Sequence, residues 1–180
     1  MAYQFLLTRR DGPVERLTLN RPGVRNAFNE VMIEELTAWA AATGADTSVR
    51  AVVIDGAGPT FSAGADLNWM RRMAEYNAAD NIADAKRLAG LFEKIAFLPL
   101  PTIVAVNGPA YGGGIGIVAA ADFAIAVPEA DFMLSEVKLG LIPAVISPYI
   151  IRAIGAHVAK QLFLSGRKFD AAEAERSGLV

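Results

Sequence analysis

The sequence predicts an α/β fold in which helices cover the faces of sheets. Short apolar runs typical of buried strands alternate with stretches whose apolar residues recur at helical spacing. Glycine and proline separate these stretches along the chain. No internal repeat, low-complexity tract or linker interrupts the 180 residues, so we expect one domain over residues 1–180.

The first half of the chain predicts a hairpin followed by alternating helices and strands. Residues 3–10 and 14–20 have the composition of strands, and the Asp11-Gly12-Pro13 segment between them is typical of a turn. The following segments predict, in order, a helix over 28–43, a buried strand over 50–55, a helix that begins near 65 and an amphipathic helix over 80–98.

The second half continues the alternation around a glycine-rich loop. Its segments predict, in order, a strand over 102–106, the loop over 108–114, a buried helix over 115–121, strands over 123–127 and 131–134, a helical turn from 135, a helix over 147–164 interrupted near 155, and a last helix over 170–177.

Composition excludes several classes of function. The net charge is −2, with 17 basic and 19 acidic residues, and no basic stripe favours nucleic acid. The absence of cysteine excludes disulfides and thiolate sites, and the single histidine, His157, excludes a histidine-rich metal cluster. The most apolar stretch contains Asn107 and Asp122, which argues against a membrane span. We therefore expect a cytoplasmic protein with no metal, no nucleic acid and no membrane partner.

Two loops could form one site for a negatively charged oxygen. Residues 61–66 and 109–114 each follow a strand, precede a helix and consist mainly of small residues. The first N–H groups of a helix lack intrahelical partners, so two facing loops can direct two donors at one oxygen, as in an oxyanion hole. Each loop alone is better explained by close packing of a helix on a sheet. No Gly-Lys-Ser/Thr follows either loop, which argues against a nucleotide phosphate loop.

Glu136 has two readings from local sequence. Ser135 is a plausible N-cap, and an acidic residue after it favours the helix dipole. In apolar surroundings the same carboxyl would act as a general acid or base with a raised pKa. Both readings stay open at this point.

Taken together, these segments resemble the crotonase superfamily, the enoyl-CoA hydratase/isomerase family. The similarity covers residues 3–180 and includes Asn20-Arg-Pro22, Asn26-Ala-Phe28, the two glycine loops and the segment 135–143 in the family's order. The resemblance implies a spiral of strand-strand-helix units that builds two roughly perpendicular sheets flanked by helices. It also implies a homo-oligomer, either a trimer or a hexamer.

The resemblance further implies an acyl-CoA substrate and a set of site residues. The N–H groups of Ala65 and Gly113 would hold the thioester oxygen, and Glu136 would transfer protons. No cofactor is implied, since CoA is part of the substrate. The residues implied in CoA binding are Val24, Arg25, Ala27, Ala63, Asp66, Leu67, Gly112 and Gly114.

A finer similarity and two departures shape the expected activity. Segments 61–70 and 135–149 resemble methylglutaconyl-CoA and carboxygeranoyl-CoA hydratases, which act on branched acidic enoyl-CoAs. Family hydratases of the best-known type carry a second glutamate where this chain has Gly116. Hydratase is the first hypothesis; a Δ3,Δ2-enoyl-CoA isomerase, which needs one acid, and a non-catalytic acyl-CoA-binding protein are the alternatives. The second departure is the chain end at Val180, from which we expect the family's C-terminal helical region to be absent.

Overall fold

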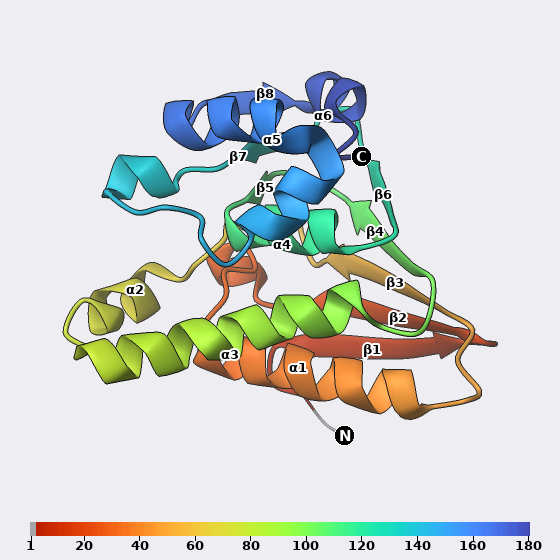
Figure 1. The fold of residues 1–180 in the computed structure, drawn as a ribbon. Helices are drawn as coiled ribbons and strands as arrows, with labels where there is room; N and C mark the ends of the chain where they lie inside the picture. Colours follow the sequence, from red (N-terminus) through yellow and green to blue (C-terminus); the bar gives the residue numbers. More distant parts are fainter. Residues whose placement is uncertain (1–2) are drawn as a thin grey trace.

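The computed structural model describes residues 3–180 and confirms the α/β fold, with two mixed sheets flanked by helices (Figure 1). The larger sheet has the order β1-β2-β3-β4-β6. Strand β1 is antiparallel to β2, and all later neighbours are parallel, as expected where helices connect the strands. Its strands are β1 (Leu6–Asp11), β2 (Val14–Leu19), β3 (Ala51–Gly56), β4 (Thr102–Val106) and β6 (Phe123–Ala126).

A smaller sheet has the order β5-β7-β8. Strand β5 (Ala110–Tyr111) is parallel to β7 (Asp131–Met133), which is antiparallel to β8 (Lys168–Asp170). An isolated bridge pairs Ser62 with Ala110, so the loop after β3 contacts the first strand of this sheet.

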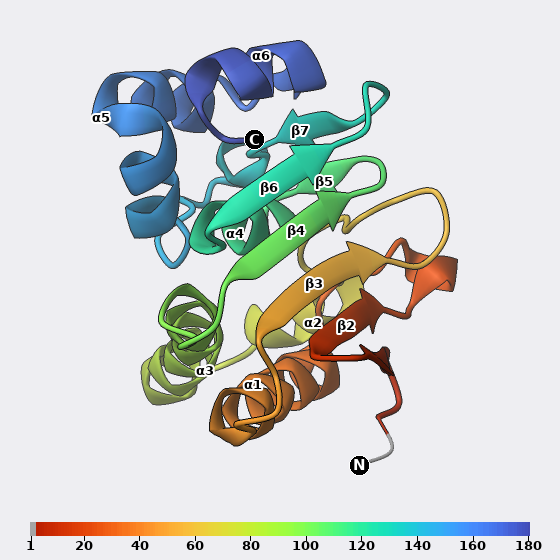
Figure 2. The same cartoon turned by 90° about the vertical axis from the view of Figure 1, so that its right-hand side faces the viewer.

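The helices connect these strands and cover one face of the larger sheet. Helices α1 and α3 lie side by side along that face (Figures 1 and 2). None of the helices between residues 3 and 180 has the length and apolar composition needed to cross a membrane. The helices are η1 (Pro22–Val24), α1 (Glu30–Ala45), α2 (Leu67–Met73), α3 (Ala78–Ala96), α4 (Gly113–Ala120), η2 (Glu136–Leu139), α5 (Ser147–Ser165) and α6 (Ala171–Ser177).

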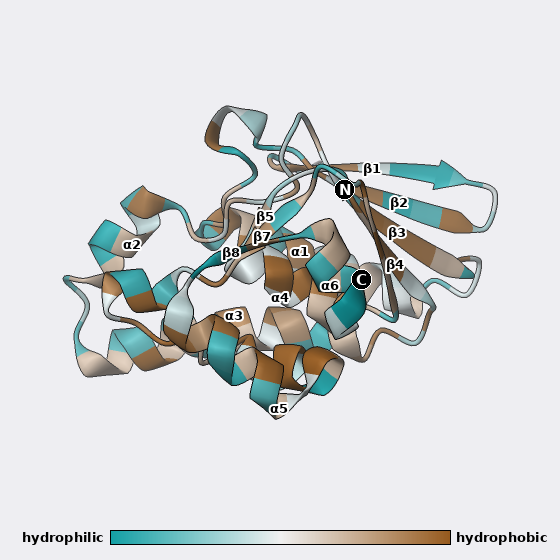
Figure 3. Ribbon diagram, turned by 90° about the horizontal axis from the view of Figure 1, so that it is seen from above, coloured by the Kyte–Doolittle hydropathy of each residue, from teal (hydrophilic) through white to brown (hydrophobic). Residues whose placement is uncertain are grey.

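The core lies between the larger sheet and its helices. Alternate side chains of a strand point to opposite faces. Val52 and Ile54 of β3 are therefore fully buried, whereas Phe123 and Ile125 of the edge strand β6 are exposed. Figure 3 shows that β3 and α4 are largely apolar along their length. Burial of one such aliphatic side chain stabilises the fold by roughly 1.5–3 kcal/mol.

Most predicted elements are confirmed, and the differences have local causes. The first strand begins at Leu6 rather than at residue 3, because the N–H groups of Gln4 and Phe5 donate to the Glu35 carboxylate of α1 at 2.5 and 2.9 Å. The predicted loop over 108–114 contains β5, and β8 is not predicted at all. Both strands have three residues or fewer, which is too short for a periodic pattern.

Two helices show how single residues set helix geometry. Helix α2 begins at Leu67, after the N-cap Asp66, rather than near residue 65. Helix α5 is interrupted at Gly155, as predicted. Gly155 has φ 75° and ψ 155°, a conformation essentially restricted to glycine.

Candidate active site

The loop after β3 is held by the backbone of Phe28. The Phe28 N–H donates to the Gly64 carbonyl at 2.7 Å, and the Asp66 N–H donates to the Phe28 carbonyl at 2.8 Å. In this parallel bridge Ala65 lies opposite Phe28, so its own N–H points away from Phe28. Within residues 3–180 this N–H has no hydrogen-bond acceptor. Ala65 is exposed, and its N–H is available to a ligand.

An ion pair fixes the far end of the same loop. One carboxylate oxygen of Asp66 accepts the N–H groups of Asn68 and Trp69, and the other accepts from Arg21 at 3.0 Å. Arg21 also donates to the Ala27 carbonyl at 2.5 Å. Burial alone would raise the pKa of Asp66, but the two N–H donors and the Arg21 guanidinium hold it below its ordinary value. Asp66 therefore stays charged and anchors the residue beside Ala65.

The second glycine loop brings another free N–H to the same place. The Tyr111 N–H donates to the Ser62 carbonyl at 2.8 Å, and the Gly112 N–H donates to Met133 of β7 at 3.0 Å. Gly113 is the first residue of α4, so its N–H has no intrahelical partner, and it finds no other acceptor in the part of the chain that the structure describes. Each loop thus presents an unpaired donor, Ala65 in the first and Gly113 in the second.

The two loops approach each other closely at Gly64 and Gly112. Gly64 has φ 85°, and a Cβ there would lie 3.0 Å from the Tyr111 carbonyl oxygen. Gly112 has φ 47°, and a Cβ there would lie 3.3 Å from Oε1 of Glu136. Glycine at both positions therefore permits the left-handed backbone and the close approach of the loops to each other and to Glu136.

Ala65, Gly113 and Glu136 line one cavity of about 290 Å³. None of the residues that line it is Lys, Arg or His. Ala63, Gly64, Gly112 and Ser135 complete the rim of the two loops. The remaining wall is apolar and consists of Phe28, Leu67, Trp69, Met70, Met73, Leu88, Leu139, Leu141, Ile142, Pro143, Ala144, Val145 and Ile146.

Glu136 is placed for proton transfer. Its Oε2 atom is buried and has no hydrogen-bond partner among residues 3–180. Burial raises the pKa of Glu136, and a hydrogen bond with its own backbone opposes that rise only in part. The capping interpretation of Ser135 is wrong, because its side chain makes no cap hydrogen bond to the short helix η2. A half-buried carboxyl of raised pKa beside two free N–H groups is an arrangement typical of acid–base catalysis.

The structure separates the residues implied in CoA binding into two groups. Ala63, Leu67 and Gly112 line the cavity, as do the three implied catalytic residues. The other implied residues do not line the cavity. Val24, in η1, and Arg25, after it, are exposed, whereas Ala27 and Asp66 are buried. A Cβ at Gly114 would lie 2.9 Å from the Ser62 Cβ, so glycine there permits close packing.

Most of the apolar wall was not predicted from the sequence. Residues 140–146 form an irregular segment without helical or strand periodicity, so no pattern marks them as cavity-lining. Trp69 is buried and also lines the cavity. His157 is exposed and lies near Gln161.

A second acid at position 116 has no space. A Cβ at Gly116 would lie 2.5 Å from Cγ2 of Ile146 and 2.7 Å from Cε1 of Phe92. Both distances are far inside van der Waals contact, so Phe92 and Ile146 occupy the volume that a glutamate side chain would need. Glu136 is the single carboxylate among the residues that line the cavity.

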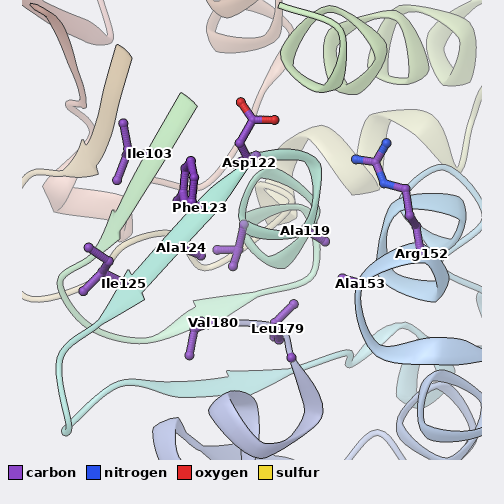
Figure 4. A pocket seen from close by; sticks show the side chains of 13 residues that line it. Ile103, Ala119, Asp122, Phe123, Ala124, Ile125, Arg152, Ala153, Leu179 and Val180 are labelled. Carbon is purple, nitrogen blue, oxygen red and sulfur yellow. The ribbon is translucent and has the colours of Figure 1, made fainter. Parts of the chain in front are cut away.

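A larger cavity, of about 480 Å³, lies beside the edge strand β6 (Figure 4). Its charged side chains have structural partners: Asp122 accepts the Thr102 N–H at 2.9 Å, and Arg152 lies over the Tyr149 ring at 5.9 Å. Most of its other lining side chains are apolar, including Ile103, Phe123 and Ile125. The smaller cavity, with its unpaired donors and unpaired carboxyl oxygen, is therefore the candidate active site.

Comparison with known proteins identifies the family of the chain. Residues 9–180 match the family model described as enoyl-CoA hydratase/isomerase. The chain is 37% identical over 176 residues to the 2,3-dehydroadipyl-CoA hydratase of Escherichia coli, and the match covers 97% of this chain and 67% of that protein.

Solved structures agree in fold. An enoyl-CoA hydratase from Shewanella pealeana superposes with a TM-score of 0.97 at 42% identity, covering 98% of this chain and 67% of that one. An enoyl-CoA hydratase from Mycobacterium smegmatis gives a TM-score of 0.93 at 35% identity, with 98% and 68% covered. The chain thus spans about two thirds of the length of these relatives. Since the family model covers nearly the whole sequence, the chain belongs to the enoyl-CoA hydratase/isomerase family.

Proposed function

We propose that the chain adds water to a 2-enoyl-CoA thioester, with Ala65, Gly113 and Glu136 as its catalytic groups. The observation that carries this proposal is the convergence of two unpaired N–H groups and one desolvated carboxyl on a single cavity. One preorganised donor of this kind contributes about 2.7–4 kcal/mol to transition-state stability. A pocket that only binds thioesters has no use for an unpaired carboxyl, which speaks for catalysis.

The proposed reaction uses the carboxylate twice. Ionised Glu136 takes a proton from a water molecule as its oxygen bonds to C3 of the substrate. The electrons of the C2=C3 bond then move onto the thioester oxygen, where the Ala65 and Gly113 N–H groups stabilise the enolate. Protonated Glu136 next delivers its proton to C2, the enolate collapses and the carboxylate is regenerated. A raised pKa suits both steps, because the group must accept and release a proton near neutral pH.

CoA is proposed to approach over the turn that precedes Phe28. The Ala63 N–H donates to the Arg25 carbonyl at 2.8 Å, which places this turn next to the rim of the cavity. Val24, Arg25 and Leu67 are exposed there, so their side chains are accessible to the pantetheine and nucleotide parts of the substrate. We retain Ala27, Asp66 and Gly114 only as supports of this path, because none of them lines the cavity.

The proposed substrate carries a branched and acidic acyl group. The relative named 2,3-dehydroadipyl-CoA hydratase supports an acidic acyl group, at 37% identity. The cavity wall contains no Lys, Arg or His, and a carboxylate buried without a partner is strongly disfavoured. The acidic end therefore points to the open side of the cavity, while the branched carbon skeleton contacts the apolar wall.

A Δ3,Δ2-enoyl-CoA isomerase is the second candidate, and the filled space at Gly116 favours it. Isomerisation moves one proton from C2 to C4, or the reverse, through a dienolate whose negative charge also rests on the thioester oxygen. One carboxylate suffices, because no water has to be activated. The oxyanion donors are used in the same way in both reactions.

A panel of three thioesters tests the proposal, with Glu136→Gln as the matched control. With the wild type, we expect loss of the enoyl absorbance of 3-methylglutaconyl-CoA and little change with crotonyl-CoA. We expect Glu136→Gln to lose turnover and to retain thioester binding. Conversion of a 3-enoyl-CoA to its 2-enoyl isomer without any hydration would transfer the assignment to isomerase. Unchanged turnover in Glu136→Gln would remove Glu136 from the mechanism.

A further inference from the structure

Phe28 contacts both loops of the proposed oxyanion hole. Its backbone makes the two hydrogen bonds that flank Ala65. Its ring packs against the other loop, because a Cβ at Gly113 would lie 2.9 Å from both Cδ2 and Cε2 of Phe28. Phe28 is 1% exposed and forms part of the cavity wall. Phe28 thus contacts the backbone on both sides of Ala65 and, through its ring, contacts Gly113.

The loops have a second connection, but it lies at their other end. The Ser62 hydroxyl donates to the Asn26 carbonyl at 2.9 Å and accepts the Gly64 N–H at 3.2 Å. The Ser62 carbonyl accepts the Tyr111 N–H at 2.8 Å. Of these bonds, only the one between Tyr111 and Ser62 joins the two loops, and both residues precede the donors Ala65 and Gly113 in the chain. Beside the donors the loops also touch directly, since Gly64 approaches the Tyr111 carbonyl and Gly112, and the Phe28 ring adds a contact with Gly113 itself.

We propose that Phe28 is a positioning residue that sets the separation of the Ala65 and Gly113 N–H groups, an inference that rests on the proposed function of these groups. Two donors act on one oxygen only when both lie about 2.7–3.1 Å from it. The Phe28 ring is rigid and close-packed, so it holds Gly113 at a fixed distance from the backbone that carries Ala65. Removal of the ring leaves the backbone contacts of Ser62 and Gly64 intact and takes away the side-chain support of Gly113.

A double-mutant cycle between Phe28 and Gly113 tests this role. In Gly113→Ala the new methyl group meets the ring and displaces the donor, although alanine itself suits the first turn of a helix. In Phe28→Ala the donor loses its support. In the double variant the methyl group enters the space that the ring has left. We expect each single variant to lose up to about 10²-fold in kcat with little change in KM, and the double variant to regain part of that loss.

The absorbance of a bound cinnamoyl-CoA provides a readout that does not require turnover. Hydrogen bonds to the thioester oxygen polarise this chromophore and shift its absorbance to longer wavelength. We expect the shift in the wild type, a smaller shift in both single variants and partial recovery in the double variant. Phe28→Leu, which keeps an apolar side chain, replaces Phe28→Ala should the latter fail to fold.

Leu36→Ala is the matched control, because Leu36 is fully buried in α1 and does not line the cavity. It removes core volume, lowers stability and leaves kcat and the spectral shift unchanged. The positioning role is overturned if Phe28→Ala loses no more kcat and spectral shift than Leu36→Ala does. It is also overturned if the losses of the two single variants simply add in the double variant. A wild type that shows no spectral shift overturns the oxyanion hole itself and the inference with it.

Discussion

A carboxyl group that loses part of its hydration shell and leaves one oxygen without a partner becomes easier to protonate, and Glu136 is such a group. Its raised pKa has two consequences. A general base of raised pKa is a stronger proton acceptor at neutral pH, which serves the proposed reaction. The same burial costs stability once the group is ionised, because the charged form is better solvated in the unfolded chain.

The pH dependence of the wild type and of Glu136→Gln follows from this shift. The folded state holds the Glu136 proton more tightly than the unfolded chain, so wild-type stability falls as pH rises from the ordinary value of 4.5 to the raised folded pKa. We predict that Glu136→Gln is more stable than the wild type at pH 7 and that the difference disappears below pH 4.5. Urea unfolding of the two proteins between pH 4 and pH 7 measures this difference. The fall of kcat/KM on the acid side should also lie above pH 4.5.

Equal stability of the two proteins at pH 7 would contradict the assigned burial of Glu136. Glu75→Gln, at an exposed position that does not line the cavity, is the control for loss of one negative charge. This variant should show the same dependence of stability on pH as the wild type over the same pH range.

At the level of elements, periodicity predicted the long segments and failed for the short ones. Helix α3 shows an apolar stripe and was predicted to within two residues at each end. The residues proposed as catalytic could be named from the sequence because they lie in motifs. Ala65 lies shortly before a helix, Gly113 is the first residue of a helix, and Glu136 follows a strand. Phe28 could not be assigned from sequence, because its role depends on a ring that packs against a residue 85 positions later. Similarly, β8 forms only through its pairing with β7.

The N-cap of α2 is predicted to matter more than an ordinary cap. Asp66 satisfies two helix N–H groups and pairs with Arg21 in partly buried surroundings, whereas Asn77 caps α3 at an exposed position with one such bond. Replacement of a cap by alanine costs about 0.5–2 kcal/mol. We expect Asn77→Ala to lie within this range without an effect on kcat.

Asp66→Ala should cost more than Asn77→Ala, because it also leaves the Arg21 guanidinium unpaired. It should lower kcat as well, since Asp66 follows the donor Ala65. Urea unfolding and steady-state kinetics on the same two variants separate the effects. Equal losses of stability in both would show that the ion pair with Arg21 contributes nothing measurable.

At the scale of the whole molecule, the open face of the larger sheet carries exposed apolar side chains. Phe123 and Ile125 of β6 are 62% and 68% exposed, and exposed apolar patches commonly mark association surfaces. The trimer or hexamer expected from the family resemblance stays a prediction. Sedimentation velocity at micromolar concentration should give three or six times the mass of one chain, and a single monomeric boundary would contradict it.

The packing around Gly116 restricts the routes by which this site could evolve. Phe92 belongs to α3 and Ile146 precedes α5, and both ring and methyl group already lie where a Cβ at position 116 would stand. A glutamate at 116 thus requires smaller residues at both positions beforehand, and each of those changes alone would leave a destabilising void. Descendants of this sequence can change the acyl wall one substitution at a time, but a second acid at this position demands several linked substitutions.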